Sequence, residues 1–124
     1  IPFFLKAGRF ISFVHRDEDG EIVHNEAETT ILEEAPGKKY IEVVPGAGIA
    51  VAVDGSNAAE IAARLADFDK TKHFLSVFVF KDSFANFESL KNEMIRSGFE
   101  YHLVPFRDDA RVYLGDQTEP VFVQ

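Results

Sequence analysis

The sequence has no cysteine and no tryptophan, and it has no long apolar run. Without cysteine, the chain has no disulfide framework, no cysteine-ligated zinc, no thiol catalysis and no iron–sulfur cluster. A membrane-spanning helix needs about 18 or more consecutive apolar residues, which this sequence does not contain. We therefore predict that the chain itself does not insert into a membrane.

Basic side chains are also few. The chain has 13 lysines and arginines against 21 aspartates and glutamates, for a formal net charge of −8. The acids are in excess in both halves, by ten to five over residues 1–55 and by eleven to eight over residues 56–124. A protein that binds nucleic-acid phosphates needs a basic stripe, because counterion release drives that binding. We therefore predict no nucleic-acid partner.

What the chain does have is a high apolar content on a modest length. Its 124 residues are the size of one domain, and 46% are hydrophobic, which is enough to bury a core. Thirteen are phenylalanine, which buries a large area without a polar group. We expect most of these phenylalanines in the core. Alternatively, some of them line a groove or an interface. Because the chain begins at Ile1, we expect a fragment or a processed chain.

Strand signals dominate the N-terminal third. Apolar runs at 3–5 and 10–14 flank a short link that contains Gly8, and this pattern predicts a β-hairpin. Further strands are predicted at 21–24 and 29–32.

A second hairpin is predicted from the apolar runs at 40–44 and 49–53, which a proline- and glycine-rich link joins. The link and the residues after it, 45–51, are also similar to a phosphate-binding glycine loop. However, Val51 stands where a third glycine is needed, and a strand follows where a helix is needed. We therefore interpret the link as a turn.

Two helices are predicted from apolar residues at helical spacing. Asn57 and Glu60 have the spacing of a capping box for the first helix, and Ser83 is a natural N-cap for the second. The expected apolar stripes are Ala58, Ile61, Ala62, Leu65 and Phe68 in the first helix, and Phe84, Phe87, Leu90, Met94 and Ile95 in the second. The side with Phe84 and Phe87 is expected to face the preceding strand.

That preceding strand, at 73–80, is a nearly continuous apolar run, which predicts burial on both faces at the centre of a sheet. With the second helix and a predicted strand at 99–106 it makes a βαβ crossover. Short edge strands are predicted at 111–114 and 120–123. The predicted fold is an α+β two-layer sandwich, with a mixed β-sheet and two helices packed on one face.

We expect a single domain over 1–124 with three parts in sequence. These are a β-rich part at 1–37, a ββαβαβ core at 38–106 and a short β tail at 107–124. No internal repeat or low-complexity tract divides the chain.

The four histidines show no metal-binding pattern, because none lies three or four residues from another. His73 and His102 are on strands that we expect to be neighbours, but a metal site would need a third ligand such as Glu100. We predict no metal site.

The carboxylates show no catalytic pattern either. Asp17, Asp19 and Glu21 alternate like calcium ligands, but the glycine and the distal glutamate are misplaced for an EF-hand. The adjacent carboxylate pairs read as solvated surface, and no serine or threonine has the context of a nucleophile. We predict no catalytic residue and no cofactor, and we favour a protein that is not an enzyme.

One candidate ligand site follows from the predicted fold. In sheets with βαβ units, ligands bind at the carboxyl ends of the parallel strands. Lys81 and Asp82 follow one such strand, and Arg107 follows the next. Lys81 and Arg107 are therefore candidates to hold an anion there, and the alternative is that both are solvated loop charges.

Residues 73–105 contain the most distinctive run, in which one strand ends in Phe80-Lys81-Asp82-Ser83-Phe84 and the next ends in Val104-Pro105. This run resembles a family of uncharacterised bacterial proteins, best represented in planctomycetes, whose strand ends in a Tyr-Pro-Asp-Ser-Phe-like motif. Lys81 stands at the position of that proline. The opening Pro2-Phe3-Phe4-Leu5 and the terminal Gln124 also resemble the two ends of the family.

This resemblance covers about half of the chain, and its motifs are structural. Members of the family are often associated with biopolymer-transport-type membrane proteins. The ββαβαβ order is also similar to the periplasmic domain of ExbD and TolR proteins, which hangs from one membrane helix and dimerises or binds partners. The resemblance implies a periplasmic or membrane-associated protein, while the residues themselves leave a cytoplasmic one open.

Two functions are compatible with these observations. The first is a non-enzymatic protein-interaction domain that binds a protein partner or forms a homodimer, as exposed β edges and surplus phenylalanine favour. The alternative is a small-ligand sensor, or an enzyme of unknown reaction, that uses the crevice near Lys81 and Arg107.

Overall fold

The computed structural model describes residues 1–107, 111–114 and 120–121. Its main element is a five-stranded mixed sheet in the order β7-β2-β1-β8-β9. The strands are β1 (Pro2–Lys6), β2 (Arg9–Ser12), β7 (Ile49–Ala50), β8 (Leu75–Phe80) and β9 (Tyr101–Phe106). β1 runs antiparallel to β2 and parallel to β8, and β8 runs parallel to β9. The predicted first hairpin and the predicted crossover are both confirmed.

A smaller antiparallel sheet has the order β11-β10-β6-β5. Its strands are β5 (Thr29–Ala35), β6 (Lys38–Val43), β10 (Val112–Leu114) and β11 (Pro120–Val121). A separate hairpin joins β3 (Val14–Arg16) to β4 (Ile22–His24). The sequence regions 1–37 and 38–106 therefore both contribute strands to the two larger sheets.

The predicted second hairpin is wrong, because β6 pairs with β5 and β10 whereas β7 pairs with β2. The link at 45–48 carries the chain from one sheet to the other. Arg9 holds this link, since its Nε and Nη2 donate to the carbonyls of Ala47 and Gly48, each at 2.8 Å. Gly48 has a φ of +83°, and a Cβ there would lie 2.4 Å from the carbonyl oxygen of Phe10. The close approach to β2 therefore requires glycine.

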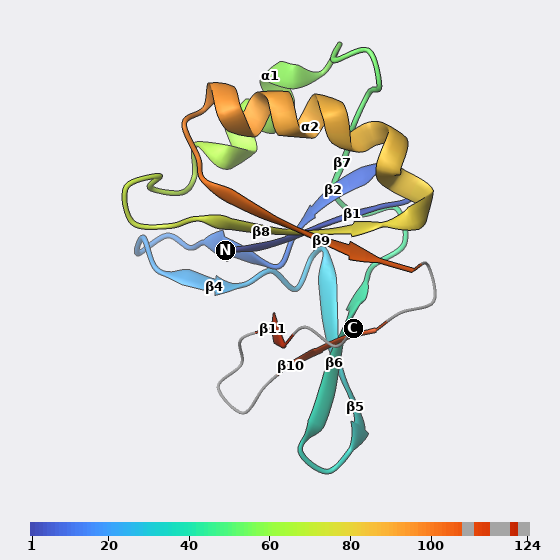
Figure 1. The fold of residues 1–124 in the computed structure, drawn as a ribbon. Helices are drawn as coiled ribbons and strands as arrows, with labels where there is room; N and C mark the ends of the chain where they lie inside the picture. Colours follow the sequence, from blue (N-terminus) through green and yellow to red (C-terminus); the bar gives the residue numbers. More distant parts are fainter. Residues whose placement is uncertain (108–110, 115–119, 122–124) are drawn as a thin grey trace.

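Both helices, α1 (Ala58–Leu65) and α2 (Phe84–Arg96), lie on the same face of the five-stranded sheet (Figure 1). The predicted α+β fold with two helices on one face is confirmed. The small sheet lies on the opposite side, below the five-stranded sheet in Figure 1. It adds a layer that the sequence does not predict. None of the helices in the described ranges is long and apolar enough to cross a membrane.

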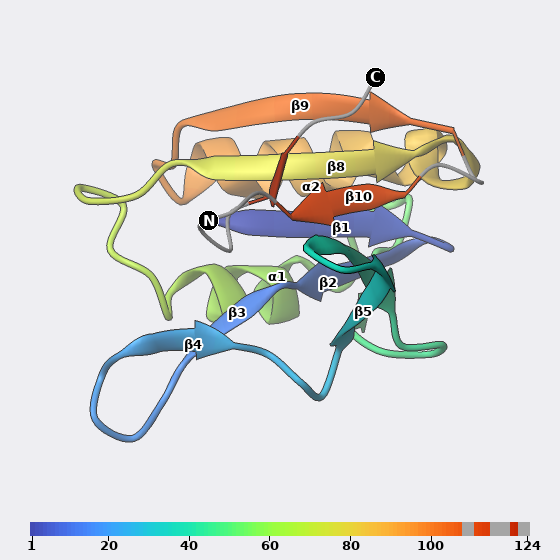
Figure 2. The same ribbon diagram turned by 90° about the horizontal axis from the view of Figure 1, so that it is seen from below.

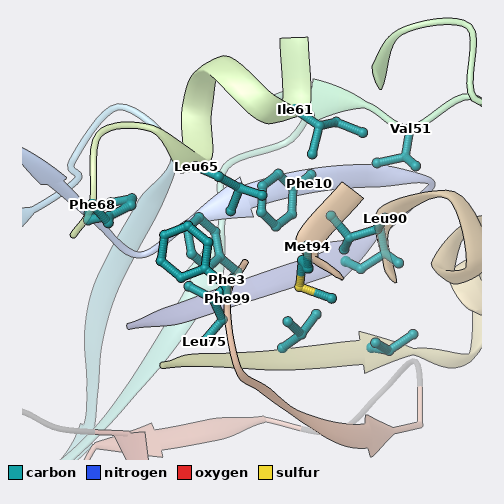
Figure 3. Packing of buried hydrophobic residues seen from close by; sticks show 13 residues of the cluster. Phe3, Phe10, Val51, Ile61, Leu65, Phe68, Leu75, Leu90, Met94 and Phe99 are labelled. Atoms are coloured by element: carbon teal, nitrogen blue, oxygen red, sulfur yellow. The ribbon is translucent and has the colours of Figure 1, made fainter. Parts of the chain in front are cut away.

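β1 contributes side chains to two hydrophobic cores, because successive side chains of a strand point to opposite faces of the sheet. Phe3 belongs to the helix-side core, where it stacks on Phe10 with ring centroids 4.5 Å apart and meets Phe68 edge-on (Figure 3). Phe4 belongs to the core on the side of the small sheet and stacks on Phe78 at 5.2 Å. Many of the phenylalanines are therefore used in these two cores.

The helix stripes are confirmed only in part. Ile61 and Leu65 of α1 and Leu90 and Met94 of α2 are buried. Phe84 is 51% exposed and Ile95 is 58% exposed, so the prediction that these two residues belong to the buried stripe is wrong. Phe87, on the side predicted to face β8, does pack against the helix-side core. Phe84 is the first residue of α2, and Ile95 lies about 100° around the helix from Met94.

The predicted helix caps are also wrong in detail. Asn57 and Ser83 occupy the N-cap positions of α1 and α2, but neither side chain bonds to its helix. The Oδ1 of Asn57 accepts from the amide of Ala52 at 3.0 Å, and its Nδ2 donates to the carbonyl of Ala50. Both side chains bond instead to backbone from elsewhere in the fold, since Ser83 accepts from the amide of Gly8.

Candidate functional site

The predicted ligand residues lie at the carboxyl ends of two adjacent parallel strands. Lys81 and Asp82 are in a one-turn 3₁₀ helix (Lys81–Ser83) directly after β8, and Arg107 directly follows β9. Phe80 and Phe106 are paired at the ends of these strands, which places the two segments side by side.

Asp82 and Ser83 hold the turn between β1 and β2. The Oδ1 of Asp82 accepts from the amide of Ala7 at 3.0 Å and from the hydroxyl of Ser83 at 2.7 Å. The Oγ of Ser83, which is fully buried, accepts from the amide of Gly8 at 2.8 Å. Ala7 and Gly8 have positive φ values of 53° and 69°, as a tight two-residue hairpin turn requires. The Asp-Ser motif thus has a structural role.

A hollow of about 690 Å³ lies elsewhere, between the β3–β4 hairpin and α1. Its lining residues are His15, Val23, His24, Asn25, Glu26, Ala27, Glu28 and Arg64. A second hollow, of about 390 Å³, is lined by residues after α1 and after α2, including Phe68, Lys70 and Phe99. Neither of these two hollows includes Lys81, Asp82 or Arg107.

A bidentate ion pair between Arg64 and Glu28 lines the larger hollow. Nη1 and Nη2 of Arg64 donate to Oε1 and Oε2 of Glu28, each at 2.5 Å, and Oε1 also accepts from the amide of Ser12 at 3.0 Å. Burial acts to raise the pKa of Glu28, but the hydrogen bonds from Arg64 and Ser12 outweigh it and lower the pKa below the usual range. Because Glu28 and Arg64 satisfy each other, we assign the pair to stability.

The histidines do not gather around a metal. The Nε2 of His24 lies 2.7 Å from the hydroxyl of Thr29, and the ring of His102 packs against Phe74 with centroids 4.8 Å apart. In the ranges that the structure describes, no three His, Asp or Glu side chains form a group that could bind a metal ion.

The open edge of β9 is the feature that stands out. β9 is the outermost strand at its end of the five-stranded sheet in the described part of the chain (Figure 2). The amide of Leu75 donates to the carbonyl of Glu100, which fixes the register of the parallel ladder. Residues 100, 102, 104 and 106 of this segment therefore turn their backbone groups toward β8. Tyr101, Leu103 and Pro105 turn theirs outward.

Exposed apolar side chains lie along the edge of β9. Leu103 is 47% exposed, and Phe74, which packs on His102, is 48% exposed. Tyr101 is half-buried against Phe87 of α2, and Val104 faces the opposite core. In the described ranges, the edge thus combines backbone groups that pair with no other strand with exposed apolar area, and none of its three outward positions carries a charge.

Sequence reasoning did not identify this edge, although one signal for it was present. Proline is tolerated in strands at edge positions, because its missing N–H then costs no ladder hydrogen bond. Pro105 occupies such an outward position in β9.

Comparison with protein-family models, with curated proteins and with solved structures finds no match for this chain. In the part of the chain that the structure describes, the outward backbone groups of β9 pair with no further strand.

Proposed function

We propose that this chain is a protein-interaction domain that binds a β-strand of a protein partner along the edge of β9. The observation that supports the proposal is the outward-facing backbone of Tyr101, Leu103 and Pro105. An exposed strand edge is a template for a further strand, because main-chain hydrogen bonds supply affinity and neighbouring side chains supply specificity.

The composition of the edge supports the same proposal. Proteins that avoid strand addition place charged residues, especially lysine, on their edges. Here the outward positions hold Tyr101, Leu103 and Pro105, and only the proline removes a donor. Leu103 also has exposed apolar area that a partner strand would cover.

The proposal is tested by a variant that blocks the edge without disturbing the ladder. In Leu103→Pro, the lost N–H points away from β8, so the pairing of β8 with β9 keeps its hydrogen bonds. Val53→Lys is the matched control, because Val53 is 66% exposed and lies outside the strands. Tagged chains of each kind are mixed with extract of the native cells and with untagged chain. We expect a bound protein that Val53→Lys retains and Leu103→Pro loses, and equal capture by both variants would overturn the proposal.

From the resemblance to transport-associated bacterial proteins, we further propose that the native protein is tethered to a membrane. Fractionation of native cells followed by an alkaline carbonate wash tests this directly. Retention in the washed membranes is the expected result, and release into the wash would contradict the tether without affecting the β9 proposal.

A further inference from the structure

We infer that the strand that occupies the edge of β9 is β9 of a second copy of this chain, paired antiparallel about a two-fold axis at Leu103. This inference rests on the proposed function, because it names the partner of the same edge. A two-fold contact uses the same patch on both chains, so the patch must be self-complementary.

The outward backbone groups of β9 meet that requirement. With the axis at Leu103, the two Leu103 residues face each other and exchange two hydrogen bonds. Tyr101 of each chain then faces Pro105 of the other, and its N–H donates to the proline carbonyl. The missing N–H of Pro105 leaves only the Tyr101 carbonyl without a donor, at the outer end of each pairing. An axis at Pro105 would instead set two residues without an N–H against each other.

The side chains are also compatible with the axis. Residues directly opposite in an antiparallel pair point to the same face, so Leu103 would pack on Leu103 of the other copy. His102 would lie opposite Val104, beside the exposed ring of Phe74. The pairing therefore removes from water the apolar side chains that flank the edge.

The charges next to β9 do not set the direction, because Glu100 precedes the strand and Arg107, Asp108 and Asp109 follow it, so that both ends are acidic. The antiparallel direction follows from the two-fold axis at Leu103, which reverses the second strand relative to the first. A standard protein–protein interface buries ~800 Å² on each partner, and pairing of a six-residue strand buries less than this. We therefore expect a weak dimer.

Cross-linking is a sharp test because the chain has no cysteine of its own. Hydrogen-bonded residues of an antiparallel pair have Cα atoms about 5.5 Å apart, which suits a disulfide. Under mild oxidant, we expect Leu103→Cys to form a disulfide-linked dimer at least about tenfold faster than the control Val53→Cys, since each tenfold is only about 1.4 kcal/mol of preference. Equal rates for the two variants would overturn the inference.

A second measurement uses the unchanged chain, so it does not depend on how a variant folds. Sedimentation and amide hydrogen exchange are recorded over a wide range of concentration. We expect a monomer–dimer equilibrium in which the amides of Tyr101 and Leu103 exchange more slowly as concentration rises. A chain that stays monomeric, or that dimerises without protecting these amides, would show that the second copy is not the occupant.

The outcomes separate this inference from the proposed function. A monomeric chain that still captures another protein in a β9-dependent way would overturn the second copy and leave the interaction domain in place. A monomeric chain whose capture is the same in Leu103→Pro and Val53→Lys would overturn both.

Discussion

The two ends of the five-stranded sheet are built in opposite ways. At one end, β7 has only two residues, and three side chains, from β2, from α2 and from the residue before α1, bind the backbone around it. Arg9, Asn57 and Asn86 donate to carbonyls between residues 47 and 51. At the other end, β9 has six residues, and its outward backbone groups meet no other strand in the described ranges. One sheet therefore has a closed edge, which stabilises the fold, and an edge that pairs with no further strand in the described ranges.

The largest expected effect is at the closed edge, in Gly48→Ala. The new Cβ would lie 2.4 Å from the carbonyl oxygen of Phe10 and would need a φ of +83°. We expect a loss of about 3 kcal/mol or more in the free energy of unfolding, from the left-handed backbone and the clash together. Gly46→Ala is the control, with a similar φ of +78° but no atom within 4 Å, and should lose about 1 to 2 kcal/mol. Urea unfolding measures both, and equal losses would contradict the close approach of β7 to β2.

The next effect is at Arg64, which ties α1 to Glu28 beside the closed edge. Its Nη1 also lies 3.4 Å from the carbonyl of Phe10 in β2. Arg64→Met leaves a mostly buried carboxylate without its partner, so we expect a loss of about 2 kcal/mol, less than for a fully buried pair. Lys91→Met, which breaks an exposed pair with Glu88, should change the free energy of unfolding by less than about 1 kcal/mol. Similar losses in the free energy of unfolding for the two variants would show that the Arg64–Glu28 pair contributes no more than an exposed pair.

A smaller effect is expected from acid, through Glu28. Its pKa in the folded chain is lower than the unfolded value of about 4.5, so the unfolded state binds more protons in that range. The stability that this carboxylate contributes is present above pH 4.5 and is lost as the pH falls through the lower folded pKa. Glu28→Gln should therefore be less stable than the native chain at pH 7 and lose less stability on acidification, as urea unfolding at a series of pH values would measure. Parallel profiles for Glu28→Gln and the native chain would refute this account.

The smallest effect on stability is expected at the open edge. Leu103→Lys replaces a half-exposed side chain whose backbone N–H makes no ladder bond, so the free energy of unfolding should change by no more than about 0.5 kcal/mol. Association through β9 should nevertheless be lost, because lysine on an edge opposes strand addition. Thermal unfolding at low concentration and sedimentation at high concentration measure the two effects. A large loss of stability would mean that β9 is not an open edge.

The sequence predicted the parts of this fold that local signals determine. The β1–β2 hairpin follows from its short turn, and the β8–α2–β9 crossover follows from a buried strand before an amphipathic helix. β6 lies between two proline-glycine links, at 36–37 and at 45–46, and only the first is the turn of a hairpin. The residues of these links show where a strand ends and not which of the two joins paired strands. The same limit applies to Ser83, whose position as an N-cap is visible in the sequence while its bond to Gly8 is not.

The candidate site was harder to predict for a related reason. Whether β9 is an edge depends on the order of strands in the sheet, which distant contacts decide. Asp82 looked like a ligand residue because it follows a parallel strand, yet its carboxylate accepts from the amide of Ala7, 75 residues away in sequence. Pro105 was the one local indication of an edge.

The position of β1 has a consequence for how the molecule unfolds. Its neighbouring residues Phe3 and Phe4 are packed into the two different cores, and both are almost fully buried. Neither core can open without exposing one face of this strand, and its withdrawal would expose both. The helix layer and the small-sheet layer are thereby coupled, so the domain should unfold in one cooperative transition, with β1 among the last segments to exchange its amide hydrogens.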